Sequence, residues 1–133
     1  RSAISALPFN SRGRICMQHL RKGRKFSRVA GQRAALLRGL AAAFITKGRI
    51  TTTEARAKEL RTFIEPLISK ARSGNLSSRK AILETLPKEA ANKLVNEVGP
   101  KFTSRPGGYV RLVKLGRRKS DGAPMALVEF VGQ

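Results

Sequence analysis

The side chains that could carry out covalent or proton-transfer chemistry are few in this chain. It contains one cysteine, one histidine and one aspartate: Cys16, His19 and Asp121. Cys16 and His19 are three residues apart, but no predicted element would hold a nucleophile against a base there. No cluster has the spacing of a metal site, and no glycine-rich phosphate-binding loop is present. We therefore expect no enzyme, no metal site, no cofactor and no small-molecule substrate.

Lysine and arginine are the residues whose number and placement predict a function. The chain has 28 of them against eight acidic residues, a formal net charge of +20. Residues 12–53 alone hold eleven cations and no acid. The surface of an ordinary soluble domain mixes both signs, because like charges repel. A segment of one sign needs a polyanion beside it, and nucleic acid, with its phosphate array and releasable counterions, is the first candidate.

The charge is distributed unevenly. Residues 1–53 have twelve basic residues and no acidic one, residues 54–100 have nine and six, and residues 101–133 have seven and two. The middle of the chain therefore reads as an ordinary globular core between two basic parts. Hydrophobic residues make up 41% of the chain, too many for a wholly disordered basic tail.

From this distribution we expect an N-terminal extension over residues 1–16, a basic RNA-binding arm over residues 17–30, and one globular α/β domain over residues 31–133. Residues 1–16 contain Ser and Arg, lack acid and do not begin with Met. That composition favours the remnant of an organellar presequence, in a mitochondrion or plastid, over a bacterial cytoplasmic protein. The alternatives are a cloning or gene-prediction remnant and a native arm that lies along RNA. Gly23 weakens any helix in the arm, which we expect to be extended.

Hydrophobic periodicity predicts the helices that would position the cations. Apolar residues at helical spacing predict a helix over residues 31–47, capped at its end by Gly48. One side of this helix would face the core and the other would face phosphate, through Arg33, Arg38 and Lys47. A strand over residues 49–52 follows.

A long central helix is predicted over residues 53–72, with Pro66 inside it. Because proline removes a backbone hydrogen bond and clashes with the preceding turn, we expect a kink there or a helix that restarts near Glu65. Two shorter helices should follow over residues 77–86 and 87–98. Gly99 and Pro100 should end the second one.

The C-terminal part reads as a loop and a β-hairpin. In the loop, Arg105 precedes a Pro-Gly-Gly turn that can bring backbone close to a partner. Strands over residues 109–115 and 125–131 flank a tip over residues 116–124. The tip carries three consecutive cations that would bind phosphate, although a plain solvated loop is the alternative: Arg117, Arg118 and Lys119. The predicted fold class is α+β, with several helices packed on a small mixed sheet that ends in this β-hairpin.

Three stretches of the chain carry a resemblance to a known family. They read MQHLRKGRKFSR, QRAALLRGLAAAFITKGRITTTEARAKELR and SRPGGYVRLVKLGRRKSDGAPMALVEF, and with the lengths between them they span residues 17–131. On these residues the chain resembles the bacterial-type large-subunit ribosomal protein seventeen family. The PGGY-to-strand element and the GRRKSDGAPMA hairpin are specific in combination, whereas a basic amphipathic helix alone is not.

The resemblance implies a structural, non-enzymatic protein that binds large-subunit rRNA near the exit of the nascent peptide. It implies three protein neighbours, the large-subunit proteins three, twenty-two and thirty-two. It also implies an rRNA-embedded arm formed by His19, Arg21, Lys22, Arg24, Lys25 and Arg28. From the first helix, it implies RNA contacts by Gln32, Arg33 and Arg38. The chain departs from the family pattern at Gln18, where a second basic residue is usual, and in residues 1–16, which have no counterpart.

Together, the residues and the resemblance predict an rRNA-binding constituent of the large ribosomal subunit that clamps rRNA segments together. Its RNA contacts would also include Lys47, Arg49, Arg105, Arg111 and the cations of the hairpin tip. One alternative is a DNA-binding basic protein, since the first two helices could pass for a helix-turn-helix. The others are a ribosome-associated translation factor and a membrane-active cationic protein, although no apolar run is long enough to span a membrane and we expect no membrane partner.

Overall fold

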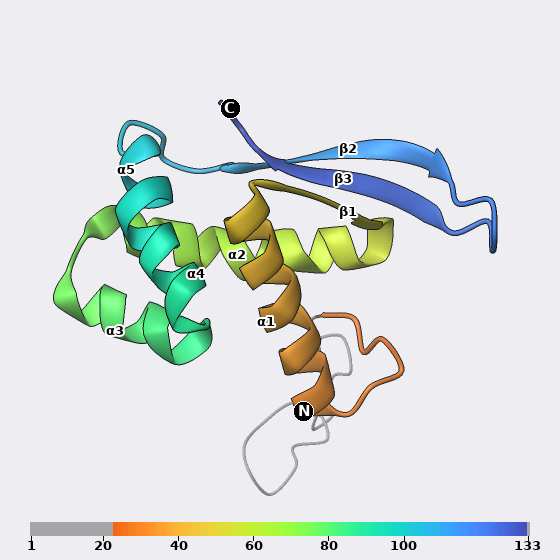
Figure 1. Cartoon of the computed structure of the whole chain (residues 1–133), viewed down its shortest axis with the longest axis horizontal. Coiled ribbons are helices and arrows are strands. Elements are labelled where there is room, and N and C mark those ends of the chain that lie inside the picture. Colours follow the sequence, from red (N-terminus) through yellow and green to blue (C-terminus); the bar gives the residue numbers. More distant parts are fainter. Residues whose placement is uncertain (1–22, 133) are drawn as a thin grey trace, which may run out of the picture.

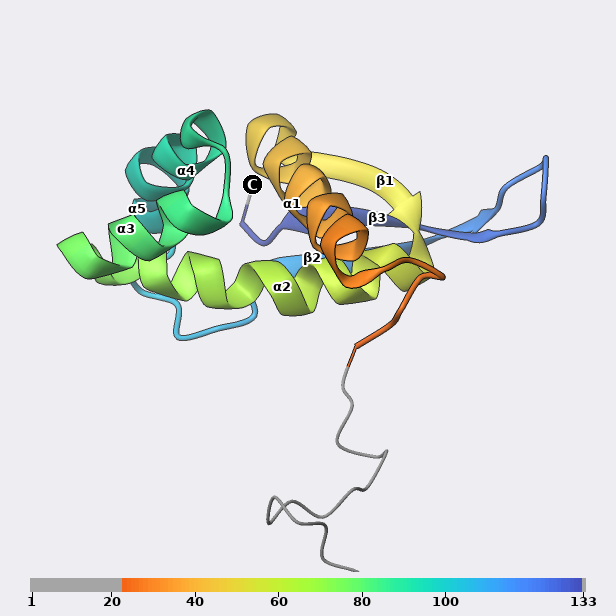
Figure 2. The ribbon, with the colours of Figure 1, turned by 90° about the horizontal axis from the view of Figure 1, so that it is seen from below.

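The structure of the chain is a computed structural model that describes residues 23–132. Helices lie on one face of a small sheet, and the hairpin of the last two strands extends beyond the N-terminal end of the central helix (Figures 1 and 2). No helix in the described part of the chain combines the length and the apolar character needed to cross a membrane. The elements in chain order are α1 (Ala30–Lys47), β1 (Arg49–Thr53), α2 (Glu54–Ser73), α3 (Leu76–Thr85), α4 (Lys88–Lys93), the π-helical η2 (Leu94–Val98), α5 (Gly99–Lys101), β2 (Val110–Arg117) and β3 (Pro124–Phe130).

Only the C-terminal half of α1 reaches the core. Ala41, Phe44 and Ile45 are buried, whereas no residue of the first half is. The first turns project past α2 on the side away from the sheet (Figures 1 and 2). The helix ends at Gly48, whose positive φ of 78° lets its N–H bond to the Phe44 carbonyl at 2.8 Å. The predicted first helix and its glycine cap are confirmed.

The central helix, α2, contacts α1, α3, η2, α5 and all three strands. It runs through Pro66 without a break, so the alternative of a restart near Glu65 is wrong. Leu60 and Ile64 before the proline and Leu67 after it are buried on the same face, while Pro66 itself is exposed. The free energy gained by burying this apolar face before and after the proline outweighs the loss of the single backbone hydrogen bond that the proline removes.

The next helical part continues from α4 through η2 and α5 as far as Lys101, so the predicted stop at Gly99 and Pro100 is wrong. The wider π-helical turn of η2 precedes Pro100 and leaves room for its ring, which would clash with the carbonyl four residues earlier in a regular α-helix. Gly99 is buried against α2. A Cβ at this position would lie 3.0 Å from the carbonyl oxygen of Ala71, so glycine permits the close approach of the two helices.

The three strands are ordered β1-β3-β2, and both pairings are antiparallel. The predicted α+β class with a terminal hairpin is therefore confirmed, although in the described residues the sheet is antiparallel rather than mixed. Alternate residues of the central strand β3 face the helices: Ala126, Val128 and Phe130 are buried. The hairpin has an irregular register between Lys114 and Arg117, just before its tip.

Aromatic side chains join the ends of the helices to the end of the sheet. The ring of Phe130 lies 4.2 Å from that of Phe44 and 6.0 Å from that of Phe102, measured between centroids. Phe102 also meets Tyr109 edge to face at 5.2 Å. The hydroxyl of Ser69 on α2 donates to the Tyr109 hydroxyl at 3.3 Å. The loop after α5 is thus packed onto the core through aromatic rings.

Candidate nucleic-acid interface

The described part of the predicted arm, residues 23–29, lies beside α2. Arg24 Nε is 3.9 Å from Glu59 Oε1. Phe26 and Ser27 have positive φ angles of 55° and 50°, and the N–H of Arg28 bonds to the Lys25 carbonyl at 3.2 Å. The arm therefore turns here rather than following the extended path that we expected. The predicted contacts His19, Arg21 and Lys22 lie outside the described residues.

A second group of cations is spread over the end of the arm and the first half of α1. Lys25, Arg28 and Arg38 are exposed, and Arg33 is half-buried. None of these four has a carboxylate partner within residues 23–132. The first turn of α1 has no acidic residue and no side-chain cap, so its free N–H groups add positive potential. We call this the α1 basic surface; it comprises Lys25, Arg28, Gln32, Arg33 and Arg38.

The sheet brings together two predicted contacts that are far apart in the sequence. Arg49 on β1 and Arg111 on β2 are both in register with Glu129 on the strand between them. Arg111 Nε lies 3.4 Å from Glu129 Oε1. Both arginines are exposed, so this single carboxylate offsets part of the charge in a well-solvated position.

At the hairpin tip the three predicted cations differ in their surroundings. Arg118 donates to both carboxylate oxygens of Asp121, which also accepts the N–H of Ala123 at 3.2 Å. These hydrogen bonds, that of Arg118 first, lower the pKa of Asp121 to about 2, and the same pair raises the pKa of Arg118. Arg117 and Lys119 have no such partner in the described part of the chain. The spacing of Arg118 and Asp121 across the tip was the sequence signal for this pair.

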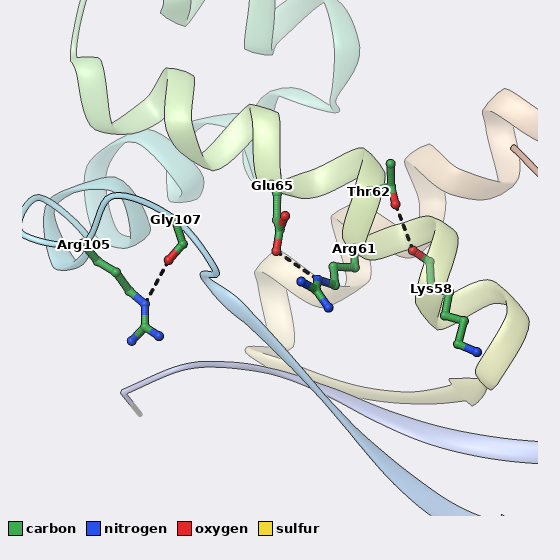
Figure 3. Close-up of polar contacts among 6 residues, drawn as sticks. All are labelled: Lys58, Arg61, Thr62, Glu65, Arg105 and Gly107. Carbon is green, nitrogen blue, oxygen red and sulfur yellow. Dashed lines mark hydrogen bonds and ion pairs between the residues drawn. The ribbon is translucent and has the colours of Figure 1, made fainter. Parts of the chain in front are cut away.

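The loop that carries Arg105 is tied to α2. Arg72 donates from Nη1 to the Arg105 carbonyl at 2.6 Å. Arg105 in turn donates from Nε to the Gly107 carbonyl at 3.1 Å, and its terminal nitrogens point away from the loop (Figure 3). Gly108 has a φ of 64°, which explains the need for glycine in this turn. The chain thus turns after Arg105 as predicted, and the hydrogen bond to Gly107 restrains the arginine side chain; the approach of this backbone to a partner stays a prediction.

Two predicted cations, Lys47 and Arg105, line two different cavities. A third cation, which the sequence analysis missed, lines both of them. Lys101 lines a cavity of about 420 Å³ together with Arg105, and a smaller one of about 140 Å³ together with Lys47. Both cavities have Val98 and Phe130 in their walls. The available signal was a lysine directly before an aromatic residue, Phe102. We call Lys47, Lys101 and Arg105 the α5 basic surface.

The carboxylates of α2, in contrast, are engaged by cations of their own neighbourhood. Glu54 lies 2.7 Å from Lys58 and 3.9 Å from Lys114, and the hydrogen bond from Lys58 is the main cause of its lowered pKa. Glu65 accepts a hydrogen bond from Arg61 Nε at 3.1 Å (Figure 3). The 690 Å³ groove between α2 and the start of β2 is lined by Lys58, Arg61 and Glu65, and the carboxylate of Glu65 makes it less suited to an anion than a wall of cations alone.

No group of three or more potential metal ligands occurs within residues 23–132. Fold and surface together define a strongly basic α+β protein, in which cations without a carboxylate partner among residues 23–132 lie along the first half of α1, at the hairpin tip and around α5.

Comparison with known proteins identifies the family to which this basic α+β protein belongs. The sequence model described as ribosomal protein L17 matches residues 36–131. The large ribosomal subunit protein bL17 of Gemmatimonas aurantiaca is 52% identical over 116 residues, which cover 86% of this chain and 98% of that protein. The bL17 proteins of Sulfurovum sp. and Campylobacter lari are each 47% identical over 116 residues, covering 86% of this chain and 100% and 99% of theirs. The chain therefore belongs to the ribosomal protein L17 family, which confirms the resemblance seen in its sequence.

Proposed function

We propose that this protein is a structural, non-enzymatic constituent of the large ribosomal subunit that binds rRNA and clamps separate rRNA segments together. Membership of the ribosomal protein L17 family carries the proposal. The relatives reported above are named as proteins of the large ribosomal subunit. The predicted RNA contacts remain as stated, and Lys101 is added to them.

The placement of charge supports rRNA binding. The acidic residues Glu54, Glu59 and Glu65 sit on α2 and are occupied by nearby cations. The cations of the α1 basic surface and the α5 basic surface are left without carboxylate partners in the described part of the chain. Such cations bind phosphate by displacing condensed counterions, which supplies most of the affinity.

The separate positions of these cations on the molecule support the proposal that the protein clamps rRNA segments together. The start of α1, the hairpin tip and the loop after α5 lie at different extremities of one packed body (Figures 1 and 2). Because α2 contacts α1, α5 and every strand, it holds all three in a fixed arrangement. RNA segments bound at two of them would be held at a set separation.

Several finer expectations stay predictions. The large-subunit proteins three, twenty-two and thirty-two are proposed as neighbours from the family resemblance. The division into an extension, an arm and one domain is likewise a proposal. The relatives are bacterial proteins, so they do not support the organellar location proposed from residues 1–16.

The test is the salt dependence of binding between the full chain and large-subunit rRNA. With about eight phosphate contacts, affinity should fall by roughly three to five orders of magnitude between 50 and 200 mM salt. An affinity that does not change with salt would contradict the proposal. Equal competition by duplex DNA would favour the DNA-binding alternative. Substoichiometric amounts in purified large subunits would favour a visiting translation factor.

A further inference from the structure

We propose that the cavity between α5 and the end of β3 receives one unpaired nucleotide of the rRNA. This inference rests on the proposed function and names a binding site within it. The cavity measures about 420 Å³. That volume falls in the range of roughly 300–1,000 Å³ typical of small-molecule sites, so it suits one nucleotide and is too small for a duplex.

Among residues 23–132, the side chains that line the cavity include two cations and no carboxylate. Lys101 and Arg105 are the charged residues that line it, and both are exposed. Neither forms an ion pair within residues 23–132. This distinguishes the cavity from the larger groove along α2, where Glu65 lies beside Arg61. The described lining would therefore attract a phosphate group and holds no side-chain carboxylate that would repel it.

Arg105 is held in a position suited to a phosphate. Its carbonyl accepts the hydrogen bond from Arg72, and its Nε is bonded to the Gly107 carbonyl. These contacts fix the loop and one edge of the guanidinium, leaving the terminal nitrogens without a partner in the described residues. An arginine restrained in this way loses less side-chain entropy on binding, and its fork matches phosphate oxygens.

The floor of the cavity is apolar and rigid. It is formed in part by Val98, Phe102 and Phe130, each less than 7% exposed. Phe102 and Phe130 are themselves held by neighbouring rings in the core. The apolar floor could contact a base while the two cations contact its phosphate. Sequence-specific RNA-binding proteins commonly bind unpaired bases, which are free to stack on such side chains.

The experiment compares variants of the full chain bound to full-length large-subunit rRNA, using chemical footprinting of unpaired nucleotides. Lys101→Gln with Arg105→Gln removes the phosphate contact. Ser104→Trp fills the cavity with a side chain and leaves both cations in place. We expect both variants to expose one nucleotide that the unmodified protein protects, while other protections remain. Affinity should fall about 10-fold for the Trp variant, and the salt slope should fall by about 0.7 for the double variant.

The matched control is Lys80→Gln with Lys88→Gln, which removes the same charge from exposed positions on α3 and α4. Thermal unfolding checks that every variant is folded. A cavity variant with the same footprint as the control would overturn the inference and leave the proposed function standing. If the unmodified protein protects no rRNA, it is the proposed function that fails.

Discussion

Arg118 holds Asp121 across the hairpin tip through two hydrogen bonds, from Nε at 2.8 Å and from Nη2 at 2.6 Å. Two backbone hydrogen bonds accompany the pair, from Gly122 N–H to the Arg118 carbonyl and from Arg118 N–H to the Ala123 carbonyl, each at 2.9 Å. The tip thus has a defined shape, and one of its three consecutive cations maintains that shape from within.

The first prediction concerns this pair. Asp121→Asn keeps the shape of the side chain but removes its negative charge and one of the two oxygens that accept hydrogen bonds from Arg118. We expect faster hydrogen exchange at the amides of Gly122 and Ala123, with little change in Tm, because both side chains are well exposed. Unchanged exchange at these amides would show that the backbone alone shapes the tip.

The same pair predicts a dependence on pH. The pKa of Asp121 is lowered from 3.8 to about 2, chiefly by the hydrogen bond from Arg118. Because the folded-state pKa is the lower one, the pair stabilises the tip above about pH 4, and this stabilisation is lost as the pH falls toward 2. The Gly122 amide shift, followed by NMR over that window, should report the loss. The Asp121→Asn variant is the control and should show no such transition.

The second contact to test is the approach of Gly99 to α2. In Gly99→Ala, the new Cβ would lie 3.0 Å from the Ala71 carbonyl oxygen, so the backbones must separate. We expect a loss of about 1–3 kcal/mol in the free energy of unfolding, measured in urea. Gly39→Ala on α1 is the matched control, because its Cβ meets nothing within 4 Å. That variant should gain roughly 0.5–1 kcal/mol, and equal effects would refute the packing argument.

A fourth prediction concerns the aromatic contact between α1 and β3. Phe44 is fully buried with its ring 4.2 Å from that of Phe130. Phe44→Ala should lower the free energy of unfolding by about 3–5 kcal/mol, since it removes apolar contact and leaves a cavity. Leu76→Ala, at a position that is 84% exposed, should change it by less than about 0.5 kcal/mol. Urea titration of both variants decides whether Phe44 anchors α1.

A fifth prediction tests whether rRNA binding depends on where the cations lie or only on the net charge. Arg33→Gln with Arg38→Gln removes two cations of the α1 basic surface. The salt slope of rRNA binding should then fall by about 1.5, as expected for two phosphate contacts. Arg79→Gln with Lys80→Gln removes two exposed cations from α3, so the net charge falls equally. Identical slopes for the two variants would mean that net charge alone drives binding.

Much of the fold could be predicted because its signals are local. The apolar spacing and Gly48 were enough to place α1, and the turn residues of the C-terminal part were enough to place the hairpin. The errors came where packing outweighed a local rule. The expected restart of α2 near Glu65, after which Pro66 follows, does not occur, and the helix expected to stop at Gly99 and Pro100 continues to Lys101. Buried residues on both sides of the first proline, and a π-helical turn before the second, keep the backbone helical.

By itself, the sequence determined the α+β class, the family and the excess of positive charge, because periodicity, motif spacing and composition are properties of the linear chain. Only the tertiary structure decided which cations of the described part of the chain lie beside a carboxylate and which do not. It placed Glu129 between Arg49 and Arg111, and it grouped Lys101 with Arg105 around an apolar cavity. Such pairings depend on strand register and helix packing, which join residues far apart in the chain.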